Sequence, residues 1–223
     1  MPACTKARTR AGHSRRRRRR VRRPRRLSLL LALLLVLAGG LAAQQLCFSP
    51  GRQAEKRVQR LAEATVPENV LQLPLEIGRA RSGQALADFT GVVIHYVGNP
   101  GTSARNNRNY FAQPTTEVCS HFVVGLEGEV IQCVPLGERS AASNSRNRDT
   151  ISIEVCHPDE TGKFNEATYE ALVELTAWLC RTGHLRAQEV IRHYDVTGKL
   201  CPLYYVEHEE AWQQLLADIA ARI

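Results

Sequence analysis

Three residues with metal-binding side chains lie near the ends of apolar segments. His95 interrupts the apolar run Gly91–Val97 just before its end, His193 closes the short run Val190–His193, and Cys201 follows in a nearby loop. A catalytic zinc site needs three protein ligands and one open coordination position. Strand ends that meet at one edge of a sheet would bring these groups together. A single histidine in a strand is more often a buried core residue, so spacing alone leaves both interpretations open.

The segments that carry these residues are predicted to be strands. Gly91–Val97 is short and continuously apolar, as in a strand that is buried on both faces. Thr150–Cys156 alternates, with isoleucine and valine on one face and Glu154 on the other. Val190–His193 is a brief third strand. Together these segments predict a sheet in which the strand ends carry side chains that can bind a metal ion or transfer a proton.

A hairpin is predicted between the first strand and the alternating one. His121–Leu126 and Glu129–Val134 are apolar runs that flank Glu127 and Gly128, a pair typical of tight turns. This hairpin adds two antiparallel strands to the predicted sheet.

Helices are predicted between and after the strands. Ser103 can cap a short helix that runs through Phe111, and Asn165 can cap a longer one closed by Gly183. A last helix carries apolar residues at helical spacing from Trp212 to Ile223. Strands interleaved with helices predict an α/β fold with a mixed central β-sheet flanked by helices, in a single catalytic domain.

Four segments, in the same order along the chain, resemble a known family. They are Ile94-His95-Tyr96-Val97-Gly98-Asn99-Pro100-Gly101-Thr102, Ser120-His121-Phe122-Val123-Val124, Ile151-Ser152-Ile153-Glu154-Val155 and His193-Tyr194-Asp195-Val196-Thr197-Gly198-Lys199-Leu200-Cys201-Pro202. This pattern closely resembles the N-acetylmuramoyl-L-alanine amidases that are related to peptidoglycan recognition proteins, and it is most similar to the bacterial cell-wall type. The resemblance runs from about residue 67 to near the end of the chain.

The resemblance implies a role for each of these polar residues. It implies zinc (Zn2+) held by His95, His193 and Cys201, and cleavage of the amide bond between N-acetylmuramic acid and L-alanine in peptidoglycan or muropeptides. Glu154 is then expected to take the proton from the attacking water and pass it to the leaving nitrogen. Lys199 is expected to stabilise the oxyanion.

The chain departs from the family pattern in two places. Some relatives carry a catalytic tyrosine where this chain has Ser120. The subgroup that lacks this tyrosine uses the strand carboxylate instead, and this chain has that carboxylate in Glu154. Many relatives also carry Trp-His-Ala-Gly ahead of the glutamate strand, where this chain reads Ser140-Ala141-Ala142-Ser143-Asn144. We expect Asn144 to replace the missing histidine in contacting the substrate. His121 is interpreted as a substrate contact or as a residue that supports the site from behind the ligands, with a core histidine as the alternative.

The positive charge of the chain is confined to its first 26 residues. These carry 13 Lys and Arg residues and no Asp or Glu, whereas residues 27–223 carry 17 basic and 22 acidic residues. A nucleic-acid-binding domain should carry its basic surface on the folded part of the chain. We therefore expect no nucleic-acid partner, and we interpret residues 1–26 as a basic tail.

An apolar segment follows the tail directly. Residues 27–43 are rich in leucine and read either as a signal-anchor or as a signal peptide cleaved near Gly40-Leu41-Ala42-Ala43. The basic flank predicts that the rest of the chain is exported, either to the outer face of the bacterial cytoplasmic membrane or into the medium. We interpret residues 44–66 as a connector and 67–223 as the zinc amidase domain.

Several other residue patterns have plainer interpretations. Most of the cysteines sit inside apolar runs, which favours small buried side chains over a disulfide framework, with one bridge outside the cytoplasm as the alternative. His157 and His208 stand beside charged or turn residues and are expected at the surface. Two other functions stay open: a peptidoglycan-binding module with weak catalysis, and a hydrolase that uses the Cys201 thiol with His193.

Overall fold

The computed structural model describes residues 33–34 and 49–223. The basic tail and most of the apolar segment 27–43 lie outside these residues. In the described part of the chain, no helix has the length and apolar character needed to span a membrane. The described residues 49–223 lie in one compact unit.

The compact unit is built on one six-stranded sheet. Its strands are β1 (Val70–Gln72), β2 (Gly91–Tyr96), β3 (Phe122–Val124), β4 (Val130–Gln132), β5 (Thr150–Val155) and β6 (Val190–Arg192). Their order across the sheet is β1-β4-β3-β5-β2-β6. Only the β3–β4 hairpin is antiparallel, and the other neighbours are parallel. The predicted mixed α/β fold is confirmed, and β1 is a strand that the sequence did not predict.

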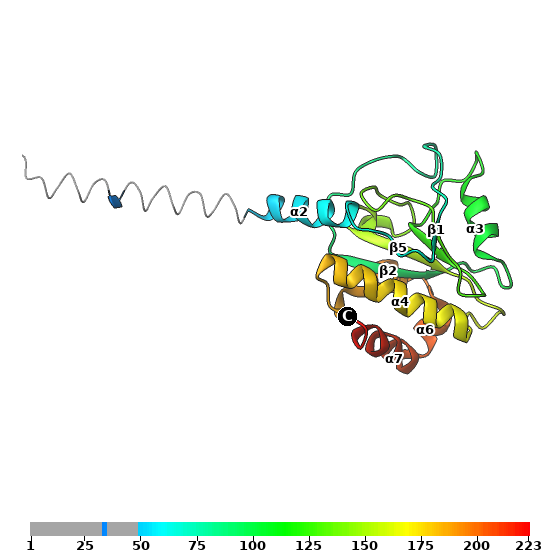
Figure 1. The fold of residues 1–223 in the computed structure, drawn as a ribbon. Coiled ribbons are helices and arrows are strands. Elements are labelled where there is room, and N and C mark those ends of the chain that lie inside the picture. The colour runs from blue at the N-terminus through cyan, green and yellow to red at the C-terminus, as the bar shows by residue number, and fades with distance from the viewer. Residues whose placement is uncertain (1–32, 35–48) are drawn as a thin grey trace, which may run out of the picture. The chain divides into compact units, whose positions relative to one another are not determined.

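Helices cover both faces of the sheet (Figure 1). The helices are α2 (Pro50–Ala62), α3 (Ala104–Phe111), α4 (Glu166–Gly183), α5 (His193–Thr197), α6 (Leu203–Glu207) and α7 (Glu209–Ala220), with short 3-10 turns η1 (Asn144–Arg148) and η2 (Ala187–Glu189). The larger hydrophobic core lies between the sheet and α4 and α7, and a smaller core lies beneath α3. Ile223, expected on the last helix, lies beyond its end and is exposed.

The predicted helix caps are present. The Ser103 side chain accepts a hydrogen bond from the backbone N–H of Asn106, and the Asn106 side chain reciprocates, which starts α3 as expected. The Asn165 side chain accepts from the N–H of Thr168 and starts α4. At the other end of α4, His184 rather than a glycine adopts the left-handed conformation.

Helix α2 belongs to the core of this unit. Leu61, near its end, is fully buried in the larger hydrophobic cluster. Arg57 on the same helix makes a bidentate pair with Asp88, with both nitrogen–oxygen distances 2.7 Å. The segment interpreted from sequence as a connector therefore contributes directly to packing.

Parallel strands β2, β5 and β6 position the polar residues. Alternation puts Val92 and Ile94 of β2 in the larger core, while His95 points to the opposite face. Glu154 of β5 is paired in register with His95. Strand β6 lies on the other side of β2 and ends one residue before His193, which begins α5. The carboxyl ends of the three strands thus meet at one edge of the sheet.

Candidate metal centre and active site

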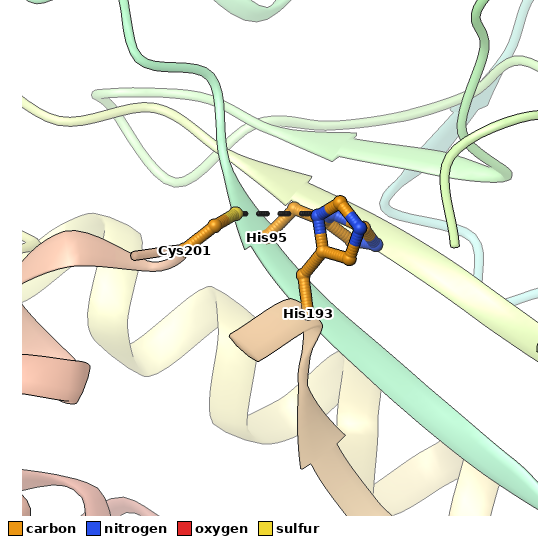
Figure 2. Close-up of side chains that lie close together, drawn as sticks. All are labelled: His95, His193 and Cys201. Carbon is orange, nitrogen blue, oxygen red and sulfur yellow. Dashed lines mark hydrogen bonds between the residues drawn. The ribbon is translucent and has the colours of Figure 1, made fainter. Parts of the chain in front are cut away.

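The three predicted ligands lie together at this edge. One ring nitrogen of His95, one of His193 and the Cys201 sulfur all lie within 4.8 Å of one another, and all three residues are buried. Figure 2 shows the side chains turned toward each other from β2, from the start of α5 and from the loop after it. The His95 Nδ1 atom is 3.9 Å from the Cys201 Sγ atom. Within the described residues, this is the group of three whose geometry suits a metal ion.

The loop that carries Cys201 is held in place by its own backbone. Gly198 ends α5 with a φ of 76°, a left-handed conformation that glycine adopts without a steric penalty. The chain then returns toward α5, and the backbone N–H of Tyr194 donates to the carbonyl of Cys201 at 2.9 Å. This closure places the thiol opposite the histidine rings.

Arg192 fixes the strand end that presents His193. Its guanidinium is largely buried, pairs with Asp195 at 3.0 Å and with Glu209 at 2.7 Å, and donates to the carbonyl of Tyr205. These contacts join β6, α5, α6 and α7. The position of His193 therefore depends on the packing of the whole C-terminal part of the chain.

Glu154 lies beside the metal-binding group. Its Oε1 atom is 3.9 Å from His95 Nδ1, and its buried Oε2 atom has no hydrogen-bond partner among the described residues. Burial raises the pKa of this carboxyl group to about 8, although the positive charge of Lys199 opposes the shift. A carboxyl group with a free oxygen and a raised pKa is suited to accept and return a proton near neutral pH.

Burial also sets the charge state of the three ligands. It lowers the pKa of His95 well below its ordinary value, and it lowers that of His193 as well, with Lys199 contributing to both shifts. Burial raises the pKa of the Cys201 thiol to about 12. Without a cation, the group therefore favours two neutral imidazoles and a thiol, and a bound divalent ion would favour the thiolate.

The ligands open into a pocket of about 580 Å³. Glu154, Lys199 and Asn144 line it together with the three ligands, and so do Phe111, Glu117, Val118 and Cys119. Lys199 is exposed at the rim. Six of the seven residues singled out in the sequence are therefore brought together around one cavity.

His121 is the exception, because the structure does not place it where the interpretation as a substrate contact requires. The residue is fully buried, does not line the pocket and is part of a hydrogen-bond network inside the protein. Its Nδ1 atom accepts from the backbone N–H of Ser152 at 3.0 Å, so its Nε2–H donates to the carbonyl of Glu138 at 2.9 Å. Burial lowers its pKa to about 4. His121 is the core histidine of the alternative interpretation.

Two other histidines differ from expectation. His157 is buried rather than at the surface; its ring packs against Tyr96, and its Nδ1 atom is 2.8 Å from the carbonyl oxygen of Asp159. His208 is partly buried and stacks on Tyr204. The cysteines behave as expected: those that the structure describes are free and buried.

Asn144 and its neighbour Ser143 contact the ligands directly. Asn144 Oδ1 is 2.9 Å from His193 Nε2, and Ser143 Oγ is 3.0 Å from His95 Nε2. Asn144 was expected to contact the substrate, and no role was expected for Ser143. Both residues belong to the segment Ser140–Asn144, ahead of the strand that carries Glu154, where the sequence departs from the family pattern.

Comparison with known proteins agrees with this geometry. Residues 85–204 match the model of a family described as N-acetylmuramoyl-L-alanine amidase. The chain is 32% identical over 143 residues to the N-acetylmuramoyl-L-alanine amidase CwlL of Bacillus licheniformis, and 34% identical over 143 residues to a probable N-acetylmuramoyl-L-alanine amidase of the same species. Each match covers 56% of this chain but only 39% and 40% of the two relatives.

Solved structures share the fold. A mutant endolysin from Bacillus subtilis superposes with a TM-score of 0.59 at 25% identity, covering 67% of this chain and 97% of that one. The structure of PlyL superposes with a TM-score of 0.60 at 20% identity, covering 67% of this chain and 96% of that one. Nearly the whole of each solved chain is matched by about two thirds of this chain. The shared fold is therefore that of the compact unit described above.

Proposed function

We propose that this chain, which belongs to the N-acetylmuramoyl-L-alanine amidase family, uses zinc to hydrolyse the amide bond between N-acetylmuramic acid and L-alanine in peptidoglycan. The observation that carries the proposal is the convergence of His95, His193 and Cys201 beside Glu154 at the wall of an open pocket. The substrate is peptidoglycan or its muropeptide fragments.

The donor set fits zinc. Two imidazoles and one thiolate are ligands that zinc prefers, and three protein ligands leave one position open. At zinc's usual bond lengths, tetrahedral geometry places a nitrogen and a sulfur ligand about 3.6 Å apart. The 3.9 Å between His95 Nδ1 and Cys201 Sγ is close to this distance, and the ligand atoms of all three residues lie within 4.8 Å of one another. When bound, zinc supplies Lewis acidity toward a water molecule and toward the scissile carbonyl.

Glu154 is proposed to carry the proton. Its free Oε2 atom takes a proton from the attacking water while the water oxygen bonds to the carbonyl carbon. The same carboxyl group then gives that proton to the alanine nitrogen as the carbon–nitrogen bond breaks. The products are a carboxylic acid and a free amine, and the carboxylate is regenerated.

Lys199 is proposed to stabilise negative charge on the carbonyl oxygen. Its ammonium lies at the rim of the pocket, close enough to influence the pKa of Glu154 and of both histidines. A fixed positive charge there favours the tetrahedral intermediate over the planar amide.

A pair of matched cysteine variants tests the metal centre. Cys201 and Cys119 are both buried and both line the pocket, but only Cys201 belongs to the metal-binding group. Cys201→Ser should lose zinc and the release of peptide from peptidoglycan, and His95→Ala should do the same. Cys119→Ser should retain one zinc per chain. Full zinc occupancy in Cys201→Ser or in His95→Ala would refute the ligand set.

Two alternative functions make different predictions. A binding module would retain sacculi without releasing peptide at any zinc concentration, whereas the enzyme would generate new amino-terminal alanine. A thiol hydrolase would be inhibited by alkylation and be indifferent to chelators. The raised pKa of Cys201 argues against the thiol hydrolase, because the thiolate is its nucleophile.

We propose in addition that residues 27–43 direct export in a bacterium, as a signal-anchor or a cleaved signal peptide. The support is the apolar composition of this segment and the basic residues ahead of it. Expressed in a bacterial host, the full chain should be digested by protease added to spheroplasts or be found in the medium. A variant that lacks residues 27–43 should stay protected inside. Full-length protein that is protected as well would contradict export.

A further inference from the structure

Two consecutive residues each contact a different histidine ligand. Ser143 Oγ lies 3.0 Å from His95 Nε2, and Asn144 Oδ1 lies 2.9 Å from His193 Nε2. We propose that Ser143 and Asn144 are a pair of positioning residues that hold both imidazoles with their Nδ1 atoms available to the metal. This inference rests on the proposed zinc centre and assigns to the pair a role toward the metal rather than toward the substrate.

The chemistry of the Asn144 contact fixes the tautomer of His193. An amide oxygen accepts hydrogen bonds and cannot donate them, so His193 Nε2 carries the proton. The remaining lone pair is then on Nδ1, which is the atom left to bind a cation. A histidine ligand usually donates its second ring N–H in this way, and such a partner increases the basicity of the metal-binding nitrogen.

His95 has the same arrangement on the other side of the site. Its Nδ1 atom faces the Cys201 sulfur and Glu154, with 3.9 Å to each. Its Nε2 atom faces Ser143, whose side chain is fully buried. When Nδ1 binds a cation, Nε2 carries the proton, and Ser143 Oγ accepts a hydrogen bond from this N–H group. The Nε2 atoms of both histidines are therefore hydrogen-bonded by two neighbouring residues of one short segment.

The backbone around this pair adopts an unusual conformation. Asn144 has a φ of 52°, in the left-handed region that asparagine tolerates better than most residues. The Asn147 side chain accepts hydrogen bonds from the backbone N–H groups of Ala142 at 3.0 Å and Ser143 at 2.6 Å. A left-handed residue costs free energy and persists where surrounding contacts fix it. Here the resulting turn directs two successive side chains to two ligands.

Substitutions at position 144 distinguish the role of the Asn144 side chain from that of its left-handed backbone conformation. Asn144→Gly keeps access to the left-handed conformation but removes the acceptor, so the fold should be preserved while His193 loses its partner. Asn144→Asp keeps an acceptor at the same place. Ser145→Ala is the matched control, because Ser145 is the exposed next residue and contacts neither ligand.

The test is the zinc affinity of each purified full-length protein, measured by competition with a chromophoric chelator. Asn144→Gly and Ser143→Ala should bind zinc about 10- to 100-fold more weakly than the wild type, the usual effect of losing such a partner. Asn144→Asp and Ser145→Ala should stay close to wild-type affinity. Thermal unfolding of the metal-free proteins should show Asn144→Gly unchanged, which separates positioning from general stability.

The outcomes distinguish this inference from the proposed function. If the wild type and Asn144→Gly bind zinc equally tightly, the positioning role is refuted while the metal centre stands. If Asn144→Asp binds zinc as weakly as Asn144→Gly, the role of the side-chain oxygen as a hydrogen-bond acceptor is refuted. If the wild type binds no zinc, the proposed centre is refuted and this inference with it.

Discussion

Glu154 and His95 are paired in the sheet but have different surroundings. They lie side by side on β5 and β2, so their side chains emerge on the same face of the sheet. His95 has a partner on each ring nitrogen, whereas Glu154 keeps one oxygen free in a buried place. This asymmetry suits one group for binding a cation and the other for moving a proton.

Glu154→Gln tests the role of the carboxyl group. Glutamine has nearly the same shape but cannot exchange the proton, so turnover should fall by about 10²- to 10⁴-fold. Zinc content should remain one per chain, because Glu154 is not among the proposed ligands. Peptide release from purified peptidoglycan and metal analysis of the same sample give both values. Loss of zinc in this variant would instead make Glu154 a ligand.

His121 predicts a pH dependence of stability. Its pKa in the folded protein is about 4, below the value of about 6.5 for an exposed histidine. Between these values the unfolded chain binds more protons, so the folded state loses stability as the pH falls. From pH 7 to pH 5 this group should lower the free energy of unfolding by about 2 kcal/mol.

The variant His121→Gln isolates this contribution. Glutamine can donate to the Glu138 carbonyl but does not titrate, and groups common to both proteins cancel in the difference. Urea unfolding of the wild type and the variant at both pH values should therefore show a shallower pH dependence in the variant. Equal slopes would mean that His121 is protonated or exposed in the folded protein.

At the residue scale, the sequence pointed to the residues that line the pocket better than to the residues that contact them. His95, His193, Glu154 and Cys201 occur within extended motifs, which made them recognisable, and the structure brings all four together. The burial of His121 depends on Ser152 and Glu138, which are distant in sequence and are brought to it by β5 and by the loop after β4. The contact of Ser143 with His95 likewise spans 48 residues. Hydrogen bonds of this range leave no local signal in one sequence.

At the scale of elements, apolar patterning located the strands that carry the site. Strand β2, strand β5 and the β3–β4 hairpin appear where their alternation or turn residues predict them. Strand β1 was missed because Pro67 and Pro74 frame a three-residue strand that is stabilised by pairing with β4. Helix α2 lies in the segment interpreted as a connector, and its packing on the core was not predicted, because Leu61 is the one residue on it that is buried.

A pair of leucine substitutions measures how much α2 contributes. Leu61 is fully buried, whereas Leu71 on the edge strand β1 is 47% exposed. Leu61→Ala should lower the free energy of unfolding by about 2 to 5 kcal/mol, since it leaves a cavity in the core. Leu71→Ala should change it much less. Chemical denaturation of both variants provides the comparison, and similar small effects would show that α2 is not part of the cooperative unit.

At the scale of the whole molecule, the compact unit from Phe48 onward holds the entire candidate site. Three features combine there: parallel strand ends at one edge, a loop that returns Cys201 to that edge, and an open pocket in front of them. The matched relatives are longer, and the match covers about two fifths of their length. The metal centre of this unit is therefore the feature on which the proposed function depends most.

X-ray absorption spectroscopy at the zinc edge tests that centre most directly. For the purified, zinc-loaded protein we predict one sulfur ligand at about 2.3 Å and three nitrogen or oxygen ligands at about 2.0 to 2.1 Å, with two of them imidazoles. The Cys201→Ser variant should lose the sulfur contribution. A spectrum of the wild type with no sulfur, or with two or more, would contradict a site made of His95, His193 and Cys201.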